Sequence, residues 1–195
     1  MSSKAAATRL NILYKAFELI YRNGYRTTSV DQIIATTQVT KGAFFHHFKN
    51  KDEMGIAMID EVMYPEMVKA FTSSLKDSDE PQEAIYLMMK ELLIENPFFD
   101  VRYGCPAINL VEELASYSTV FHSSLHRLTM GWKTALSTWL TKGQLSGKIK
   151  SDVKPDDTAM FILSGYSGAR NLGKVYGNQS YTAYLSQLRL YLNQL

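Results

Sequence analysis

The amino-acid sequence predicts an all-α protein with about nine helices. Apolar residues recur at three- and four-residue intervals along nearly the whole chain, which is the spacing of amphipathic helices, and no segment alternates like a β-strand. Hydrophobic residues make up 46% and charged residues 21% of the 195 residues, as in ordinary globular proteins. We expect a helix-turn-helix domain of three short helices over residues 1–52 and a helical domain over residues 53–195.

Turn and capping residues delimit the first three helices. An apolar stripe over residues 10–21 predicts the first helix, and the Asn-Gly pair at 23–24 ends it. Ser29, with a glutamine three residues later, fits the capping box of a second helix, although Thr28 is an alternative cap. A third helix is predicted from about Thr40 to His47, after a short turn.

The rest of the chain continues in helices that are separated by proline and glycine. Asn50 caps a long, methionine-rich helix, in which Pro65 predicts a kink. A break over 77–81 precedes a helix that begins at Pro81. Four more helices are expected: over Ala107–Tyr117, from about Ser118 to Gly143, from Lys154 onward, and along the stripe Tyr181–Leu192.

The helix that follows Lys154 is apolar on nearly all sides over residues 158–169. Such a helix must be buried, and a chain of this length buries it most easily against a second copy of itself. Small residues in this helix allow another helix to approach closely. The predicted dimer interface comprises Phe161, Gly165, Gly168, Tyr184 and Leu188.

The net charge of +2 conceals an uneven distribution. Residues 1–51 carry eight basic and two acidic side chains, a net charge of +6, whereas residues 52–195 carry a net charge of −4. A basic head on an acidic body predicts a polyanionic partner for the head. The alternative is a surface that is uneven by chance.

Cysteine and histidine usage limits the chemistry that we expect. A single cysteine, Cys105, makes no internal disulfide, and the N-terminus lacks the apolar run of a secretory signal, so we expect a cytoplasmic protein with no membrane partner. The neighbours His46 and His47 point in different directions on a helix, and His122 and His126 have no obvious third ligand. We therefore expect neither a metal nor another cofactor.

The third predicted helix is the candidate for the major groove of DNA, which is wide enough for one helix. Residues at the start and outer face of this helix are expected to contact DNA, and residues at neighbouring helix N-termini are expected to meet phosphates. The candidate DNA-binding residues are Thr28, Ser29, Thr40, Lys41, Gly42, Ala43, Phe45, His46 and Lys51.

Residues 27–54, TTSVDQIIATTQVTKGAFFHHFKNKDEM, resemble the DNA-binding signature of the TetR family of bacterial repressors. The resemblance covers about residues 8–56. It implies a homodimer with a four-helix interface that binds a palindromic operator, and a small molecule in each body that releases the operator. Two residues depart from the pattern: Gln38 stands where the family usually has glycine, and Phe45 where it often has tyrosine. A left-handed backbone at Gln38 would cost roughly 1 kcal/mol.

Cys105 and a set of aromatic residues are candidates for sensing a signal. Cys105 lies near a predicted helix N-terminus, which favours a reactive thiolate, and a similar segment occurs in some TetR-like regulators whose cysteine senses electrophiles or oxidants. The alternative role of Cys105 is packing. Aromatic residues of the body, Phe98 among them, either line an apolar effector pocket or form the core. The candidate pocket residues are Cys105, Asn109, Phe99, Tyr103, Trp132 and Tyr166.

These patterns together predict a ligand-responsive transcriptional repressor that is not an enzyme. In this hypothesis the kink at Pro65 lets movement of the body tilt the DNA-binding head, whereas a static bend is the alternative. An enzyme and a constitutive DNA-binding dimer are the two alternative functions. An enzyme with Cys105 as its nucleophile needs an imidazole base beside the thiol, and a constitutive DNA-binding dimer needs no effector.

Overall fold

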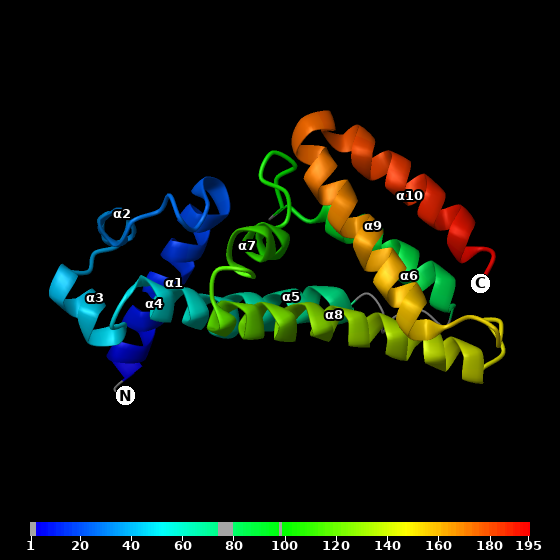
Figure 1. The fold of residues 1–195 in the computed structure, drawn as a ribbon, viewed down its shortest axis with the longest axis horizontal. Coiled ribbons are helices and arrows are strands. Elements are labelled where there is room, and N and C mark those ends of the chain that lie inside the picture. Colours follow the sequence, from blue (N-terminus) through cyan, green and yellow to red (C-terminus); the bar gives the residue numbers. More distant parts are fainter. Residues whose placement is uncertain (1–2, 74–79, 98) are drawn as a thin grey trace. The chain divides into compact units, whose positions relative to one another are not determined.

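The computed structural model describes residues 3–73, 80–97 and 99–195, and every regular element in these ranges is helical (Figure 1). The predicted break at 77–79 and the candidate Phe98 lie outside the described residues. The described helices are α1 (Ser3–Asn23), α2 (Val30–Ala35), α3 (Lys41–His47), α4 (Lys51–Met58), α5 (Tyr64–Ser73), α6 (Pro81–Lys90), α7 (Pro106–Leu114), α8 (Thr119–Leu145), α9 (Pro155–Tyr176) and α10 (Asn178–Leu192).

The predicted all-α fold is confirmed. Two π-helical turns, η1 (Ile59–Met63) and η3 (Glu91–Glu95), continue α4 into α5 and lengthen α6. Within the described ranges the chain therefore forms nine continuous helices. None of the helices described is long and apolar enough to cross a membrane.

The first helices begin and end where their turn and capping residues predict. Helix α1 ends at Asn23, and Gly24 follows with φ of +89°, a conformation that suits glycine. Ser29 caps α2 in a complete capping box, because its hydroxyl accepts from the backbone N–H of Gln32 and the Gln32 amide oxygen accepts from the N–H of Ser29. Asn50 caps α4 in a similar way.

Both π-helical turns lie just before a proline. Turn η1 ends two residues before Pro65, and η3 ends two residues before Pro97. A proline has no N–H and its ring clashes with the carbonyl of the preceding turn, so the wider turn relieves a strain that a regular helix would carry. Pro65 therefore changes the helix type upstream of itself, at a place where sequence analysis predicts a kink.

The described chain packs as two compact units, each with its own core. Unit 1 comprises Met1–Glu66 and Pro106–His126, and unit 2 comprises Met67–Cys105 and Arg127–Leu195. The boundaries between units fall within α5 and α8 and directly before α7. The predicted functional boundary at residue 52 stays a prediction.

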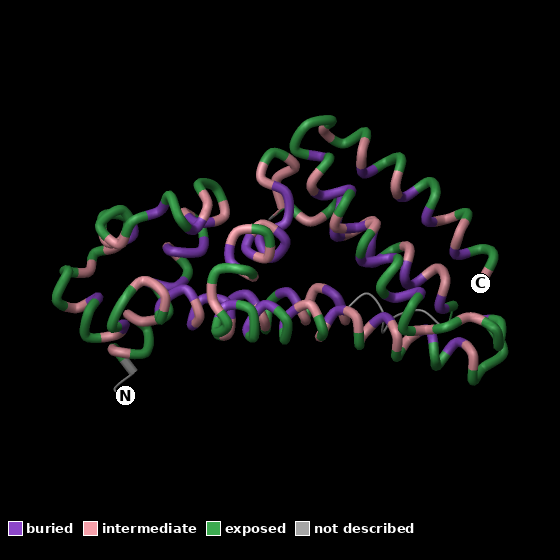
Figure 2. Tube along the Cα trace, in the orientation of Figure 1, coloured by how far each residue is buried: buried purple, intermediate pink, exposed green. Residues whose placement is uncertain are grey.

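Helices α9 and α10 form the main hairpin of unit 2, and buried positions recur along both of them (Figure 2). Two glycines of α9 let α10 approach. A Cβ at Gly165 would lie 2.4 Å from the Tyr184 ring, and one at Gly173 would lie 2.6 Å from the Tyr181 ring. Gly168, between them, faces open space. Gly165 and Gly173 thus allow α9 and α10 to pack closely, whereas Gly168 lies at the surface of the hairpin.

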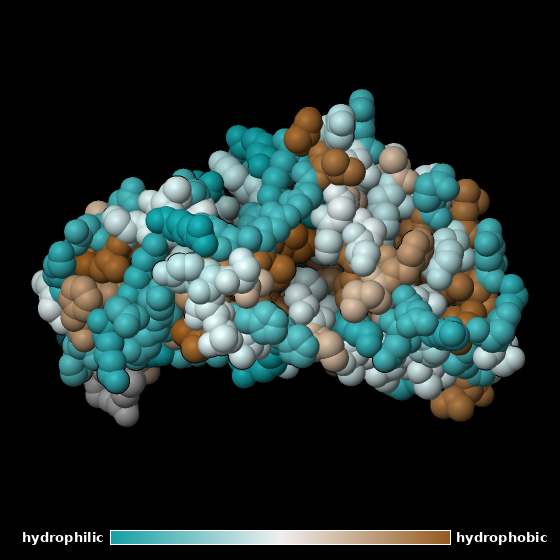
Figure 3. Space-filling view, in the orientation of Figure 1, coloured by the Kyte–Doolittle hydropathy of each residue, from teal (hydrophilic) through white to brown (hydrophobic). Residues whose placement is uncertain are grey.

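Exposed apolar side chains remain on the α9–α10 hairpin. Figure 3 shows hydrophobic atoms at the surface near the turn between the two helices. Isolated exposed apolar residues are common on proteins, but several on one pair of helices indicate an interaction surface. The exposed set is Met160, Phe161, Leu172, Val175, Tyr176 and Leu190.

Candidate nucleic-acid interface and ligand site

Helix α3 separates its residues cleanly into a buried and an exposed side. Phe44 and Phe48, four residues apart, are buried in the core of unit 1. The opposite side is exposed, including 46% of Phe45, and Ala43 is half-buried at the edge. We call the exposed positions the reading face; it consists of Lys41, Gly42, Phe45 and His46.

The residues at the start of α3 are exposed. Thr40 caps the helix by accepting from the Ala43 N–H at 3.2 Å. The Lys41 ammonium donates to Asp31 at 2.9 Å, but both side chains are largely exposed, so a phosphate can replace the carboxylate at little cost. A Cβ at Gly42 would meet nothing within 4 Å, so the space beside this glycine is not occupied by other described atoms of the protein.

The two candidates at the start of α2 differ in their surroundings. Ser29 is exposed and caps the helix. Thr28 is 1% exposed, and its hydroxyl donates to the Gly24 carbonyl at 2.7 Å. The Thr28 side chain therefore stabilises the turn that follows α1 and has almost no surface for a contact with DNA.

The turn between α2 and α3 contains no strained residue. No non-glycine residue in the described chain has a positive φ, so Gln38 does not carry the left-handed strain considered above. Side chains stabilise the turn instead. Thr36 and Thr37 donate their hydroxyls to the carbonyls of Ile33 and Ile34 at the end of α2.

Lys51 is partly engaged within unit 1. Its ammonium donates to the Tyr25 carbonyl at 2.6 Å and lies 4.3 Å from the centre of the Tyr25 ring. Burial lowers the pKa of Lys51, while Asp52 and Glu113 act in the opposite direction. The Tyr25 hydroxyl donates to Asp52 at 2.6 Å, and burial, followed by Asp52, raises the pKa of Tyr25. Lys51 thus holds the turn after α1 in addition to its predicted phosphate role.

Arg9 of α1 anchors the end of α3. Its guanidinium donates to the Glu61 carboxylate through two nitrogens and to the His47 carbonyl at 3.1 Å. The same group lies 4.4 Å from the centre of the Phe48 ring. Burial, and after it His46 and Arg9, lower the pKa of His47. The reading face is therefore fixed to α1 at its C-terminal end.

A carboxylate on α7, which sequence analysis missed, fixes the loop before α2. Glu113 accepts from the backbone N–H groups of Tyr25 at 2.8 Å and Arg26 at 2.6 Å. The predicted pocket residue Asn109 lies one turn earlier on α7, beside a cavity of about 10 Å³ that Glu113 also lines. Such a cavity is too small for an effector. The sequence offers no signal for Glu113, because its partners lie 87 and 88 residues away.

In unit 2, the structure brings three predicted pocket residues together around an arginine that sequence analysis missed. Cys105, Tyr166 and Phe99 all adjoin Arg170 of α9, which is fully buried. Cys105 is 1% exposed and lies near Tyr166. Burial and Cys105 raise the pKa of Tyr166, against the influence of Arg170. The only hint in the sequence is one arginine within a helix of small and apolar residues.

The other two predicted pocket residues of unit 2 are Trp132 and Tyr103. Trp132 is 3% exposed and stacks on Phe71, with ring centres 4.6 Å apart, and Phe71 meets Tyr166 edge-on at 6.0 Å. Trp132 thereby joins the same aromatic cluster. Tyr103 is half-buried, with the Arg102 guanidinium 5.3 Å from its ring centre. Asn109 belongs to unit 1.

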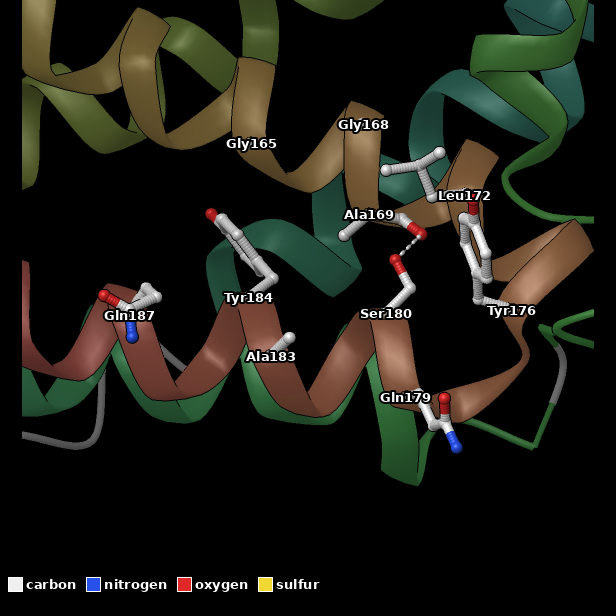
Figure 4. Close-up of a pocket in the computed structure, with 10 residues that line it drawn as sticks. All are labelled: Gly165, Gly168, Ala169, Leu172, Tyr176, Gln179, Ser180, Ala183, Tyr184 and Gln187. Carbon is white, nitrogen blue, oxygen red and sulfur yellow. Dashed lines mark hydrogen bonds between the residues drawn. The ribbon is translucent and has the colours of Figure 1, made fainter.

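The residues predicted for a dimer interface lie on the α9–α10 hairpin in two environments. Gly165, Gly168 and Tyr184 line an open groove of about 610 Å³ between the helices, which Figure 4 shows. Phe161 is exposed, whereas Leu188 is 3% exposed and packs in the core of unit 2. Leu188 therefore has almost no surface to offer a second copy. Within the groove, Ser180 donates to the Ala169 carbonyl at 3.0 Å (Figure 4).

The histidine pairs lie on α3 and α8. The rings of His46 and His47 are 5.4 Å apart, and those of His122 and His126 are stacked at 6.1 Å. Across residues 3–73, 80–97 and 99–195, no three histidine, cysteine or acidic side chains are grouped to hold a metal ion.

Two family models match the chain. The model for bacterial regulatory proteins of the tetR family matches residues 12–58, which include α2 and α3. The model for the tetracyclin repressor-like C-terminal domain matches residues 91–188, half of the chain. Together they include the reading face, Arg170 and most of the α9–α10 hairpin.

Individual proteins are similar over most of the chain. The transcriptional repressor DhaR of Mycobacterium sp. (strain GP1) is 27% identical over 161 residues, which are 83% of this chain and 79% of DhaR. The crystal structure of a TetR-family regulator from Cytophaga hutchinsonii has a TM-score of 0.90 at 19% identity and covers 100% of this chain and 98% of its own. Reduced NemR of Escherichia coli has a TM-score of 0.82 at 21% identity, over 93% and 95% of the two chains.

Proposed function

This chain belongs to the TetR family of bacterial transcriptional regulators, and we propose that it represses transcription by binding a palindromic operator as a homodimer until a small molecule releases it. The observation that carries the proposal is the exposed reading face on a rigidly anchored α3, together with the family match on both halves of the chain. Each half supports one part of the mechanism.

The reading face supplies the chemistry for binding duplex DNA. Lys41 offers a cation for a phosphate, Gly42 lets the DNA backbone approach closely, and Phe45 offers an apolar contact to a thymine methyl group or a sugar. Phe45 has no hydroxyl, so it makes no hydrogen bond to a phosphate there. The exposed Ser29 and Thr40 lie at helix N-termini, where the helix dipole favours phosphate.

The α9–α10 hairpin supports a dimer. Its exposed apolar side chains and the groove around Gly168 suit a second copy of the same hairpin, which would complete a four-helix interface. Two reading faces would then enter major grooves whose half-site centres lie about 34–36 Å apart, or a multiple of that distance. A protein that acts on bacterial DNA in this way works in the cytoplasm.

The signal is proposed to act in unit 2. Two kinds of signal were expected, a bound small molecule or an electrophile that reacts with Cys105. The thiol is almost completely buried, which supports packing for Cys105 and favours a bound molecule as the signal. The family match supports a DNA-binding regulator, and we expect the chain to release its operator without turnover.

The decisive experiment is a selection of bound duplexes from a random library with the full-length protein, at low salt. We expect an inverted repeat to be enriched, and its affinity to fall steeply as salt increases because Lys41 and its neighbours displace counterions. A Phe45→Ala variant should fold normally and bind the selected duplex less tightly. If the wild-type protein enriches no duplex even at low salt, the proposed function is wrong.

A further inference from the structure

Arg170 is a buried cation that no carboxylate of the described residues neutralises. Its side chain is fully buried, and its guanidinium donates to the Leu92 carbonyl, to the Tyr166 hydroxyl at 3.3 Å and to the Tyr181 hydroxyl at 3.2 Å. None of these acceptors carries a full negative charge, and no acidic side chain in the described residues forms an ion pair with Arg170. Burying an unpaired charge is costly, so such a group calls for an explanation.

The contacts that Arg170 makes explain its position but do not balance its charge. The Asn96 N–H donates to the Glu91 carbonyl, and Pro97 has no N–H, so the last turn of η3 leaves the Leu92 carbonyl for the guanidinium. A helix C-terminus supplies roughly half a negative charge. The rings of Phe99, Tyr166 and Tyr181, 4.7–5.5 Å from the guanidinium carbon, add cation–π attraction but no formal charge.

A second buried donor, the indole nitrogen of Trp132, lies in the same aromatic core. Among the residues that the structure describes, it has no hydrogen-bond acceptor. An indole N–H can only donate. Trp132 connects to Arg170 through a continuous series of rings, since it stacks on Phe71 and Phe71 meets Tyr166, the hydroxyl of which accepts from Arg170. Among the described residues, the centre of unit 2 therefore contains one buried cation without a carboxylate partner and one buried indole N–H without an acceptor, connected by aromatic rings.

We propose that Arg170, Tyr166, Tyr181, Phe99 and Cys105, which we call the Arg170 cluster, bind a small monocarboxylate with an apolar body. This inference rests on the proposed function, because it assigns the chemical class of the effector. The planar guanidinium matches a carboxylate, and the hydroxyls of Tyr166 and Tyr181 can turn from accepting to donating toward it. The rings would enclose the apolar body and exclude a more strongly hydrated anion such as phosphate.

Binding would compete with a contact that the protein now makes. Arg170 has no exposed surface, so a carboxylate reaches it only when the guanidinium leaves the Leu92 carbonyl. The carboxylate then takes the place of that carbonyl, and the end of η3 loses its cap. A ligand with this effect prefers an altered arrangement of residues 91–97, which is the differential interaction that any effector needs.

The test measures thermal unfolding of the full-length protein with sodium butanoate, hexanoate and benzoate at constant ionic strength. The matched amides butanamide, hexanamide and benzamide are the neutral controls, and inorganic phosphate is the second anion. We expect at least one carboxylate to raise the Tm saturably, with an apparent affinity at least tenfold higher than that of its amide or of phosphate. The same carboxylate should weaken binding to the selected operator.

Two variants decide whether the effect belongs to the cluster. Arg170→Gln should lose the preference for the carboxylate over the amide, whereas Arg189→Gln, which removes an arginine on α10 outside the cluster, should keep it. Should Arg170→Gln fail to fold, Tyr181→Phe serves instead and is expected to weaken carboxylate binding several-fold. An unchanged affinity in the variant that folds would overturn the inference.

Three further results would also overturn it: no response to any carboxylate, equal responses to acid and amide, or binding that leaves operator affinity unchanged. Operator binding without ligand is measured in parallel. A protein that binds its operator but ignores carboxylates refutes this inference alone, whereas a protein that binds no operator refutes the proposed function.

Discussion

The reading face and the Arg170 cluster are assembled from the sequence in opposite ways. The reading face lies within six consecutive residues of one helix and is exposed. The Arg170 cluster is buried except for the half-buried Phe99, and it combines residues of α9 and α10 with two residues of the segment between η3 and α7. Binding DNA needs a surface, which helical periodicity alone can present, whereas enclosing a small molecule needs side chains from several segments.

The neighbours Phe44 and Phe45 test this contrast most strongly. Phe44→Ala should lower the free energy of unfolding by about 3–5 kcal/mol, because the ring is fully buried. Phe45→Ala should change it by about 0.5 kcal/mol or less and reduce operator affinity instead. Urea denaturation and DNA-binding titrations measure the two quantities. Similar losses of stability in both variants would contradict the division of α3 into two sides.

Two glycines on α9 offer a comparable pair in unit 2. Gly165→Ala should destabilise the protein by about 1–3 kcal/mol, because its Cβ would lie 2.4 Å from the Tyr184 ring. Gly168→Ala meets open space and gains up to about 1 kcal/mol of helix propensity, yet should weaken the proposed dimer. Thermal unfolding and sedimentation equilibrium distinguish these effects. A dimer unaffected by Gly168→Ala would argue against this surface as the interface.

Lys41 tests whether the reading face acts through charge. Lys41→Ala should reduce the slope of log affinity against log salt by about one, because one phosphate contact is lost. Stability should hardly change, since the ion pair with Asp31 is exposed. Lys133→Ala is the matched control, because Lys133 forms an ion pair of the same length with Asp156 on unit 2. Equal changes of slope in both variants would exclude a specific contact by Lys41.

The smallest effect is expected from Glu83 and Arg189 in unit 2. The hydrogen bond from Arg189 lowers the pKa of Glu83, so the pair stabilises the protein above the unfolded-state pKa of about 4.3. This contribution is lost as the pH falls through the lower folded-state pKa. It should be below about 1 kcal/mol, because both side chains are substantially exposed. Glu83→Gln should therefore lower the Tm at pH 7, and a gap that does not narrow as the pH falls below about 4 would contradict this account.

Local sequence signals predicted the helices well. Capping residues such as Ser29 and Asn50 act on N–H groups within the next few residues, so their effect is visible in the sequence. Likewise, the four-residue spacing of Phe44 and Phe48 matches the buried side of a helix, and both side chains are buried. The π-helical turns escaped prediction, although a proline follows each of them.

Long-range partners limited what the sequence could reveal of the ligand site. Arg170 meets Leu92, which lies 78 residues away, and Glu113 meets the turn after α1 from 87 residues away. No periodicity reports such pairs, because they depend on which helix faces pack together. Aromatic residues in the body could be named as pocket candidates, but the cation at their centre became evident only from the fold.

Arg9 has a practical consequence for anyone who shortens this protein. One guanidinium ties α1 to Glu61, to the His47 carbonyl and to the Phe48 ring. The end of α3 therefore depends on a residue that lies before residues 27–54, the segment with the predicted DNA-binding signature. A fragment that starts after residue 9 would keep all of that signature and lose its anchor. Expression fragments and N-terminal fusions should therefore preserve the chain from a point before Arg9.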